Sequence, residues 1–131
     1  MSDERTKRMG TGRPPTRVKD LPPEWLHHLR TIKAADEAWL VADEKRAAFR
    51  NEKGDEGLTF RQIQNLDEYQ ALSTEAQELR TRRIDAMINA INDGVSMYRI
   101  AKHIGLSSSA HVSLLVKGRE RALAKERAQE G

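Results

Sequence analysis

The spacing of apolar residues predicts a long amphipathic helix over about residues 24–51. Apolar side chains recur there at steps of three, four and seven residues, which places them on one helical face. They are Trp25, Leu29, Ile32, Ala35, Trp39, Ala42 and Phe49. Two interpretations stay open: the stripe packs on later helices of the same chain, or it forms a self-association surface through Trp25, Leu29, Ile32 and Trp39. The second interpretation has equal weight because so short a chain offers little surface on which so long a helix can pack.

Further helices are expected after an interior break. Residues 51–57 contain two glycines and predict a loop. Thr59 and Gln62 have the spacing of a capping box, so a helix is expected to start there, and residues 73–75 are expected either to interrupt it or to cap a new one. Another series of apolar residues at helical spacing runs over 74–93, and it ends at Asn92-Asp93-Gly94, which is typical of the end of a helix. Because no segment alternates polar and apolar residues, the predicted fold class is all-α.

Composition favours a small protein with a thin core. The chain has 131 residues, of which 37% are apolar and 33% charged, against about 45–50% and about 25% in ordinary globular proteins. There is no cysteine, so no disulfide framework is available. The longest apolar run, residues 38–42, is far shorter than the roughly 20 residues that span a bilayer. We therefore expect a cytoplasmic protein with no membrane segment.

Charge is concentrated at the two ends of the chain. Residues 1–20 carry 6 basic and 3 acidic side chains, residues 21–93 carry 10 and 14, and residues 94–131 carry 7 and 3. Basic ends favour a polyanionic partner. In the first of them, Gly12-Arg13-Pro14-Pro15 with Arg17 nearby resembles the core of segments that insert an arginine into the DNA minor groove. The alternative for residues 1–20 is a flexible, solvated basic arm.

Two short helices joined by a glycine turn are predicted after residue 94. Ser96 is placed to cap the first, whose inward face is Met97, Ile100, Ala101 and Ile104. The small side chain of Ala101 lets a second helix cross closely. Gly105 permits the left-handed turn that follows, and Leu106 can fill the corner. Val112, Leu115 and Val116 then form the inward face of a second helix that Gly118 is expected to end. This is the spacing of a helix-turn-helix.

These residues resemble the helix-turn-helix DNA-binding proteins of bacteria and their phages. The resemblance rests on Ile100-Ala101, on Ile104-Gly105-Leu106-Ser107 and on Val112, Leu115 and 117–119, and it covers about the last 45 residues when 74–93 serves as the supporting helix. In the commonest form of the pattern the inward residue of the second helix falls six after the glycine, which here is His111. Two registers are therefore possible, and we favour Val112 inward because burying an unpartnered imidazole costs free energy.

In the favoured register, polar and basic side chains remain on the outer surface as candidate DNA contacts. Serine and histidine side chains can hydrogen-bond to phosphates or base edges, Leu114 can touch a thymine methyl, and lysine and arginine give affinity more than sequence choice. The candidates are Arg99, Lys102, Ser107, Ser108, Ser109, His111, Ser113, Lys117 and Arg119.

No motif for catalysis, a cofactor or a metal is present, so we expect a protein that is not an enzyme. The predicted organisation is a basic arm (1–20), a helical self-association or partner-binding region (21–72), the DNA-binding module (73–118) and a charged tail (119–131), which either extends a helix or frays. The predicted function is sequence-specific binding of double-stranded DNA by a homodimeric transcription regulator, more readily a repressor than an activator. The alternative is a helical adaptor or phage assembly protein whose N-terminal helices bind a protein partner.

Overall fold

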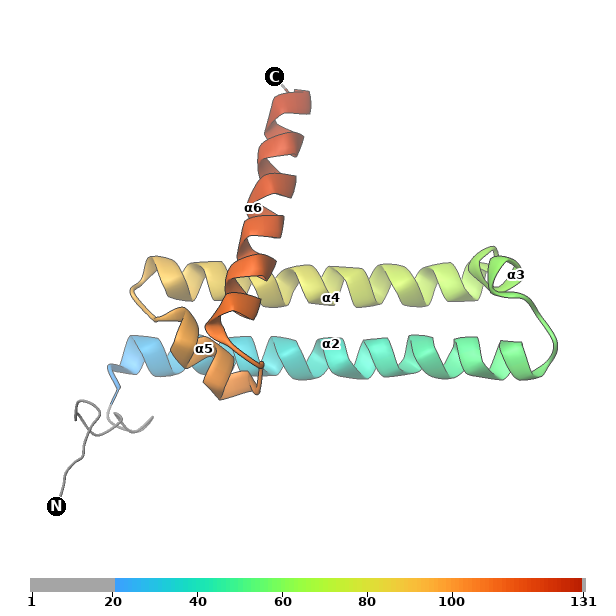
Figure 1. The fold of residues 1–131 in the computed structure, drawn as a ribbon, viewed down its shortest axis with the longest axis horizontal. Helices are drawn as coiled ribbons and strands as arrows, with labels where there is room; N and C mark the ends of the chain where they lie inside the picture. Colours follow the sequence, from blue (N-terminus) through green and yellow to red (C-terminus); the bar gives the residue numbers. More distant parts are fainter. Residues whose placement is uncertain (1–20, 131) are drawn as a thin grey trace, which may run out of the picture.

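The protein is a long helical hairpin with two further helices at one end (Figure 1). A computed structural model describes residues 21–130. The helices are α2 (Pro23–Asp55), α3 (Phe60–Gln64), α4 (Asp67–Asn92), α5 (Met97–Ile104) and α6 (Ser109–Glu130). α2 and α4 lie side by side and antiparallel, α3 connects them at one end, α5 lies at the other, and α6 projects away from the hairpin. Residues 21–130 contain no strand, which confirms the all-α prediction.

Two predicted breaks in the hairpin are wrong. α2 continues to Asp55 through most of the expected 51–57 loop, and the chain turns only at Gly57, where φ is +97°. α4 runs from Asp67 without interruption, so residues 73–75 neither end a helix nor begin one, and the expected boundary between 72 and 73 falls inside α4. In both places packing between α2 and α4 outweighs local sequence signals.

The predicted capping box at the start of α3 is confirmed. The Gln62 backbone N–H donates to Thr59 Oγ1 at 3.2 Å, and the Thr59 N–H donates to Gln62 Oε1 at 2.8 Å. These reciprocal bonds satisfy backbone donors that the helix itself leaves unpaired. At the same end of the hairpin, Tyr69 stacks on Phe49 with ring centroids 6.2 Å apart and meets the edge of Phe60 at 6.4 Å.

The largest apolar cluster lies where α2, α4, α5 and α6 meet. Its best-buried members come from all these helices and from the turn between α4 and α5, so the N-terminal end of α2 and the C-terminal end of α4 anchor the last two helices. The largest fully buried side chains are Leu29, Ile32, Met87, Val95, Ile100 and Val112.

The long apolar stripe of α2 packs on the chain itself, which confirms the first of its two interpretations. Leu29 and Ile32 are 1% and 0% exposed. Trp25 is half-buried and its Nε1–H donates to the Asp93 carbonyl oxygen at 3.2 Å. Trp39 is half-buried with its ring over the guanidinium of Arg83. Leu29 and Ile32 therefore have no surface left for self-association. Trp25 and Trp39 keep part of their surface, so self-association through these two side chains stays a prediction.

A buried ion pair holds the middle of the hairpin. Arg83 of α4 donates to Asp36 Oδ1 of α2 at 2.6 Å, and both residues are less than a tenth exposed. The guanidinium also lies 4.4 Å from the centroid of the Trp39 ring. Two charges removed from water need each other, so the pair fixes how α2 is aligned along α4.

Two further sequence predictions concern the N-terminal arm and the absence of a membrane-spanning segment. The N-terminal arm with Arg13 and Arg17 lies outside the described residues. In the part that the structure describes, no helix combines the length and apolar character of a membrane-spanning segment.

Candidate nucleic-acid interface

The turn between α5 and α6 forms as its residues predict. Ser96 caps α5, its Oγ accepting from the Arg99 backbone N–H at 3.1 Å. Gly105 ends the helix in the left-handed conformation with φ of 75°, and the Leu106 N–H donates to the Ala101 carbonyl oxygen at 2.8 Å. This bond closes a helix C-terminus where a left-handed residue reverses the chain. Leu106 packs against the core, so the corner is filled as expected.

α6 adopts the register with Val112 inward. Val112 and Val116 are 0% and 6% exposed, Leu115 packs partly buried against the same cluster, and His111 is exposed. Leu114 is 69% exposed. The preference for this register is confirmed. The valines supply apolar surface to the core, whereas His111 inward would have required a buried partner for its ring.

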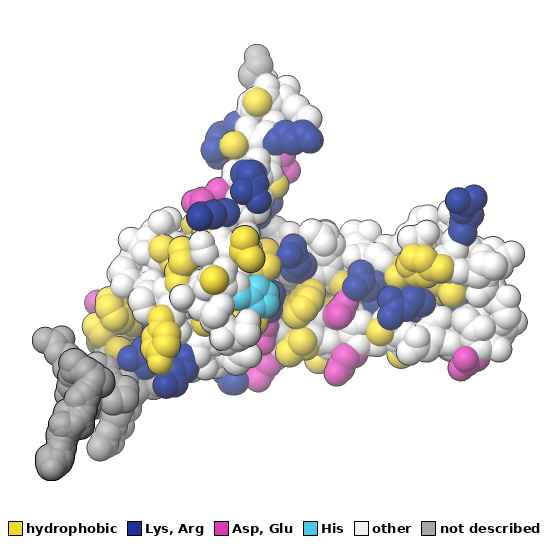
Figure 2. Space-filling model, viewed as in Figure 1, with side chains coloured by type: hydrophobic (Ala, Val, Ile, Leu, Met, Phe, Trp, Pro, Cys, Tyr) yellow, Lys and Arg dark blue, Asp and Glu magenta, His cyan; other side chains and the backbone are white. Residues whose placement is uncertain are grey.

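α6 does not end at Gly118, contrary to prediction. It continues to Glu130, so most of the charged tail extends the helix, which was one of the two alternatives for 119–131. A glycine within a helix costs about 1 kcal/mol relative to alanine but does not stop it. The second half of α6 projects from the hairpin, and Figure 2 shows lysine and arginine side chains along it.

Most candidate DNA contacts lie on the outer surface around α5 and α6. Ser113 and Arg99 are half-buried, and the other candidates apart from Arg119 are exposed: Lys102, Ser107, Ser108, Ser109, His111 and Lys117. On a helix, Leu114 points away from Val112 and Val116, and Lys117, Arg121 and Lys125 follow Leu114 on the outward side. Lys125 was missed as a candidate because the helix was expected to end at Gly118.

Arg119 serves a structural contact. Its Nε–H donates to Asp85 Oδ1 at 2.9 Å and a terminal N–H donates to Oδ2 at 3.3 Å. This hydrogen bonding to Asp85 raises the pKa of Arg119 above its usual range. The bidentate pair joins α6 to α4, so the prediction of Arg119 as a phosphate contact loses its physical basis: a carboxylate already occupies the face of the guanidinium that a phosphate would use.

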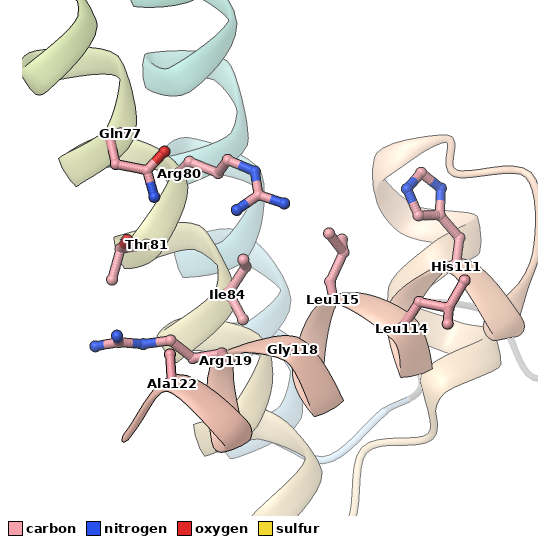
Figure 3. A pocket seen from close by; sticks show the side chains of 10 residues that line it. All are labelled: Gln77, Arg80, Thr81, Ile84, His111, Leu114, Leu115, Gly118, Arg119 and Ala122. Carbon is pink, nitrogen blue, oxygen red and sulfur yellow. The ribbon is translucent and has the colours of Figure 1, made fainter. Parts of the chain in front are cut away.

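A groove of about 520 Å³ separates α6 from the neighbouring part of α4 (Figure 3). Leu114, Leu115 and Gly118 form the α6 side, and Arg80 and Gln77 lie on the α4 side. His111 also lines it. The groove therefore borders the outward face of α6, and Arg80 adds a basic side chain beside that face.

A second group of basic side chains lies where α5 packs on α2. Partial burial of His103, followed by the charges of Lys33 and Arg99, lowers its pKa below the ordinary histidine value of 6.5. Lys33 belongs to α2 and the other two to α5. No local pattern could indicate that Lys33 joins this group, because it lies 66 positions before Arg99 in the chain.

Neither metal-site geometry nor similarity to known proteins adds to this description. Across residues 21–130, no three histidine or carboxylate side chains are arranged to hold a metal ion. No protein-family model, curated protein or solved structure matches the chain significantly.

Proposed function

We propose that the protein binds double-stranded DNA through a helix-turn-helix made by the end of α4, α5 and the first half of α6, and that it acts as a sequence-specific transcription regulator. The observation that carries the proposal is the register of α6. Val112 and Val116 are in the core, and a polar surface with an exposed Leu114 remains on the opposite side. A helix anchored in this way can enter the major groove with its outward face against the bases.

Each side chain on this surface then has a physical role at the DNA. Lys102 and Lys117 contact phosphates, which supplies affinity that falls with salt. Ser109 and Ser113 hydrogen-bond to phosphate or base edges, and Leu114 contacts a thymine methyl. None of these side chains reads a base as strongly as a bidentate arginine on guanine. Sequence choice therefore comes from several weak contacts.

A pair of protomers gives the specificity that one lacks. Two half-sites about 34 Å apart, one helical turn, match two recognition helices related by a two-fold axis. Occupancy of such a site excludes the transcription machinery without any further contact surface, so repression is the proposed action. This agrees with the resemblance to small bacterial and phage regulators.

The test is selection of DNA sites from a random duplex pool by the wild type, Lys117→Glu and Lys45→Glu. Lys117 and Lys45 are both exposed, but Lys45 lies on α2 away from the proposed interface. We expect the wild type and Lys45→Glu to enrich one defined, preferably palindromic, site. Lys117→Glu should bind that site at least about tenfold more weakly, because it replaces a phosphate contact by repulsion.

The proposal is contradicted if Lys117→Glu and Lys45→Glu bind the selected site with equal affinity. Binding that is weak, indifferent to sequence and steep in salt would reduce the helix-turn-helix to a nonspecific tether. No duplex binding at low salt would remove the proposal altogether.

A second candidate, a helical adaptor, is favoured by the opposite end of the hairpin. Phe60 is 51% exposed there, and a cleft of about 410 Å³ at the same end is lined by Phe49, Leu58 and Leu66. Lys53 and three carboxylates also line this cleft, namely Glu56, Asp67 and Glu68. Exposed apolar surface with a charged rim is typical of a protein-binding site.

Phe60→Ser tests the adaptor better than a change at Trp39. Trp39 covers the buried Arg83, so its replacement would disturb folding as well as any surface. A cellular partner that co-purifies with the wild type and Lys117→Glu but not with Phe60→Ser would favour the adaptor. A partner held equally by Phe60→Ser would count against the exposed Phe60 surface as its binding site.

A further inference from the structure

We infer that Lys33, Arg99 and His103 form a phosphate-binding subsite for the DNA backbone, which extends the interface onto α2 and makes DNA binding stronger as the pH falls. The inference rests on the proposed function, since its ligand is the backbone of the same duplex. It adds a helix, α2, that the helix-turn-helix itself does not include.

Packing of α5 on α2 places the three basic residues on the two sides of one contact between helices. Ile32 and Ile100 are both 0% exposed and belong to one apolar cluster. Lys33 follows Ile32 in the chain, Arg99 precedes Ile100, and His103 lies one helical turn after Ile100. The backbone of each basic residue is therefore fixed beside the contact between α2 and α5. A site built on packed helices needs little reorganisation to bind.

The charges in this subsite repel one another until an anion is bound. The pKa of His103 is lowered by partial burial, by the Lys33 ammonium from α2 and by the Arg99 guanidinium from α5. Within residues 21–130, no carboxylate and no charged side chain of α4 or α6 contributes to that shift. Glu37 lies near, 3.9 Å from Lys33 Nζ, but both side chains are more than half exposed and such a pair is weak.

The subsite is continuous with the proposed DNA-binding surface. Lys102 follows Arg99 by three residues on α5 and is exposed, with its Nζ 3.5 Å from the Tyr98 hydroxyl. Tyr98 is itself 60% exposed. Basic groups of α5 thus lead from the α6 side of the interface toward Lys33.

A bound phosphate shifts the pKa of His103 in the direction opposite to that of the neighbouring basic groups. The negative charge of the backbone phosphodiester favours the imidazolium, so binding raises the pKa of His103 from its lowered value. By linkage, protonation of His103 then strengthens binding of the phosphate. DNA affinity therefore increases as the pH falls through the range in which His103 titrates in the complex, and the increase disappears when residue 103 cannot be protonated.

The first experiment measures binding to a 20-base-pair random-sequence duplex against salt, for the wild type, Lys33→Gln and Lys45→Gln. Both lysines are exposed on α2, and only Lys33 lies in the subsite. Loss of one phosphate contact should reduce the slope of log affinity against log salt by about 0.9 in Lys33→Gln and by nothing in Lys45→Gln.

The second experiment follows the His103 ring by NMR through a pH titration of the free protein, the protein with the duplex, and the protein with inorganic phosphate at matched ionic strength. We expect the duplex to raise the pKa of His103. A shift of the same size with inorganic phosphate at equal phosphate concentration would assign the subsite to the free ion and overturn the DNA role.

His103→Gln supplies an independent check that does not depend on Lys33. Its duplex affinity should vary less between about pH 5.5 and about pH 8 than that of the wild type, because residue 103 can no longer be protonated. This inference would be overturned, with the proposed function unaffected, if the duplex binds but two changes are missing. These are the lower salt slope in Lys33→Gln and the rise in the pKa of His103. Absence of any duplex binding would overturn both.

Discussion

At the scale of single residues, two glycines of the α5–α6 segment have opposite roles. Gly105 has φ of +75° and permits the turn, whereas Gly118 lies within α6. A Cβ added at either would meet no atom within 4 Å. The effect of replacing them is therefore set by backbone conformation and not by steric contact.

Alanine at these two glycines should change stability in opposite directions. Gly105→Ala forces a Cβ into the left-handed region and should lower the free energy of unfolding by about 1–2 kcal/mol. Gly118→Ala should raise it by up to about 1 kcal/mol, because alanine is the better helix former. Urea denaturation followed by circular dichroism measures both. Equal effects of the two substitutions would mean that the α5–α6 turn does not depend on the left-handed glycine.

At the scale of elements, the pairing of α2 with α4 depends on a polar contact within an apolar seam. Asp36 and Arg83 are buried together under Trp39, and Arg83 Nε is buried without a hydrogen-bond partner. Elsewhere the seam is lined by small or apolar side chains such as Ala42 and Ala76, which would tolerate a shifted alignment. The ion pair therefore contributes more to the uniqueness of the alignment than to its strength.

Single and double replacements separate these two contributions. Arg83→Met leaves Asp36 buried without a counter-charge and should cost about 3–5 kcal/mol of unfolding free energy. The double variant Asp36→Leu with Arg83→Met should recover most of that loss, as measured by thermal and urea unfolding. If the double variant is as unstable as the single one, the pair contributes net stability and our assignment of its role is incorrect.

At the scale of the whole molecule, the core is concentrated at one end. The main apolar cluster joins α5 and α6 to the hairpin, while α6 beyond Arg119 projects from it. Only Val112 and Val116 of α6 are buried. The eleven residues 120–130 would be marginally stable as an isolated helix in water, so the two halves of α6 should differ in stability although they form one helix.

Hydrogen exchange should resolve this difference. Amides of residues 112–118 should open only with much of the core, whereas those of 120–130 should exchange at rates near those of an unfolded peptide. Native-state exchange followed by mass spectrometry or NMR gives both rates on one sample. Equal protection in the two halves, at a concentration where the protein is a monomer, would contradict the view that the projecting half lacks support.

Local signals in the sequence predicted those features that depend on a few neighbouring residues. The capping box at Thr59, the cap at Ser96, the left-handed turn at Gly105 and the inward register at Val112 all follow from hydrogen bonding or burial within one or two helical turns. The three interior helix boundaries expected near 51, 73 and 118 failed because packing and continuous backbone hydrogen bonding override weak breakers in a helix.

The sequence by itself determined that the chain is helical, where the α5–α6 turn lies and which face of α6 is available, since these follow from periodicity and glycine conformation. Only the tertiary structure decided that the stripe of α2 is internal, that Arg119 is held by Asp85 and that the charge of Lys33 acts on His103. Such contacts join residues 34 to 70 positions apart, and their energies depend on burial and on charges from other helices. No local pattern carries that information.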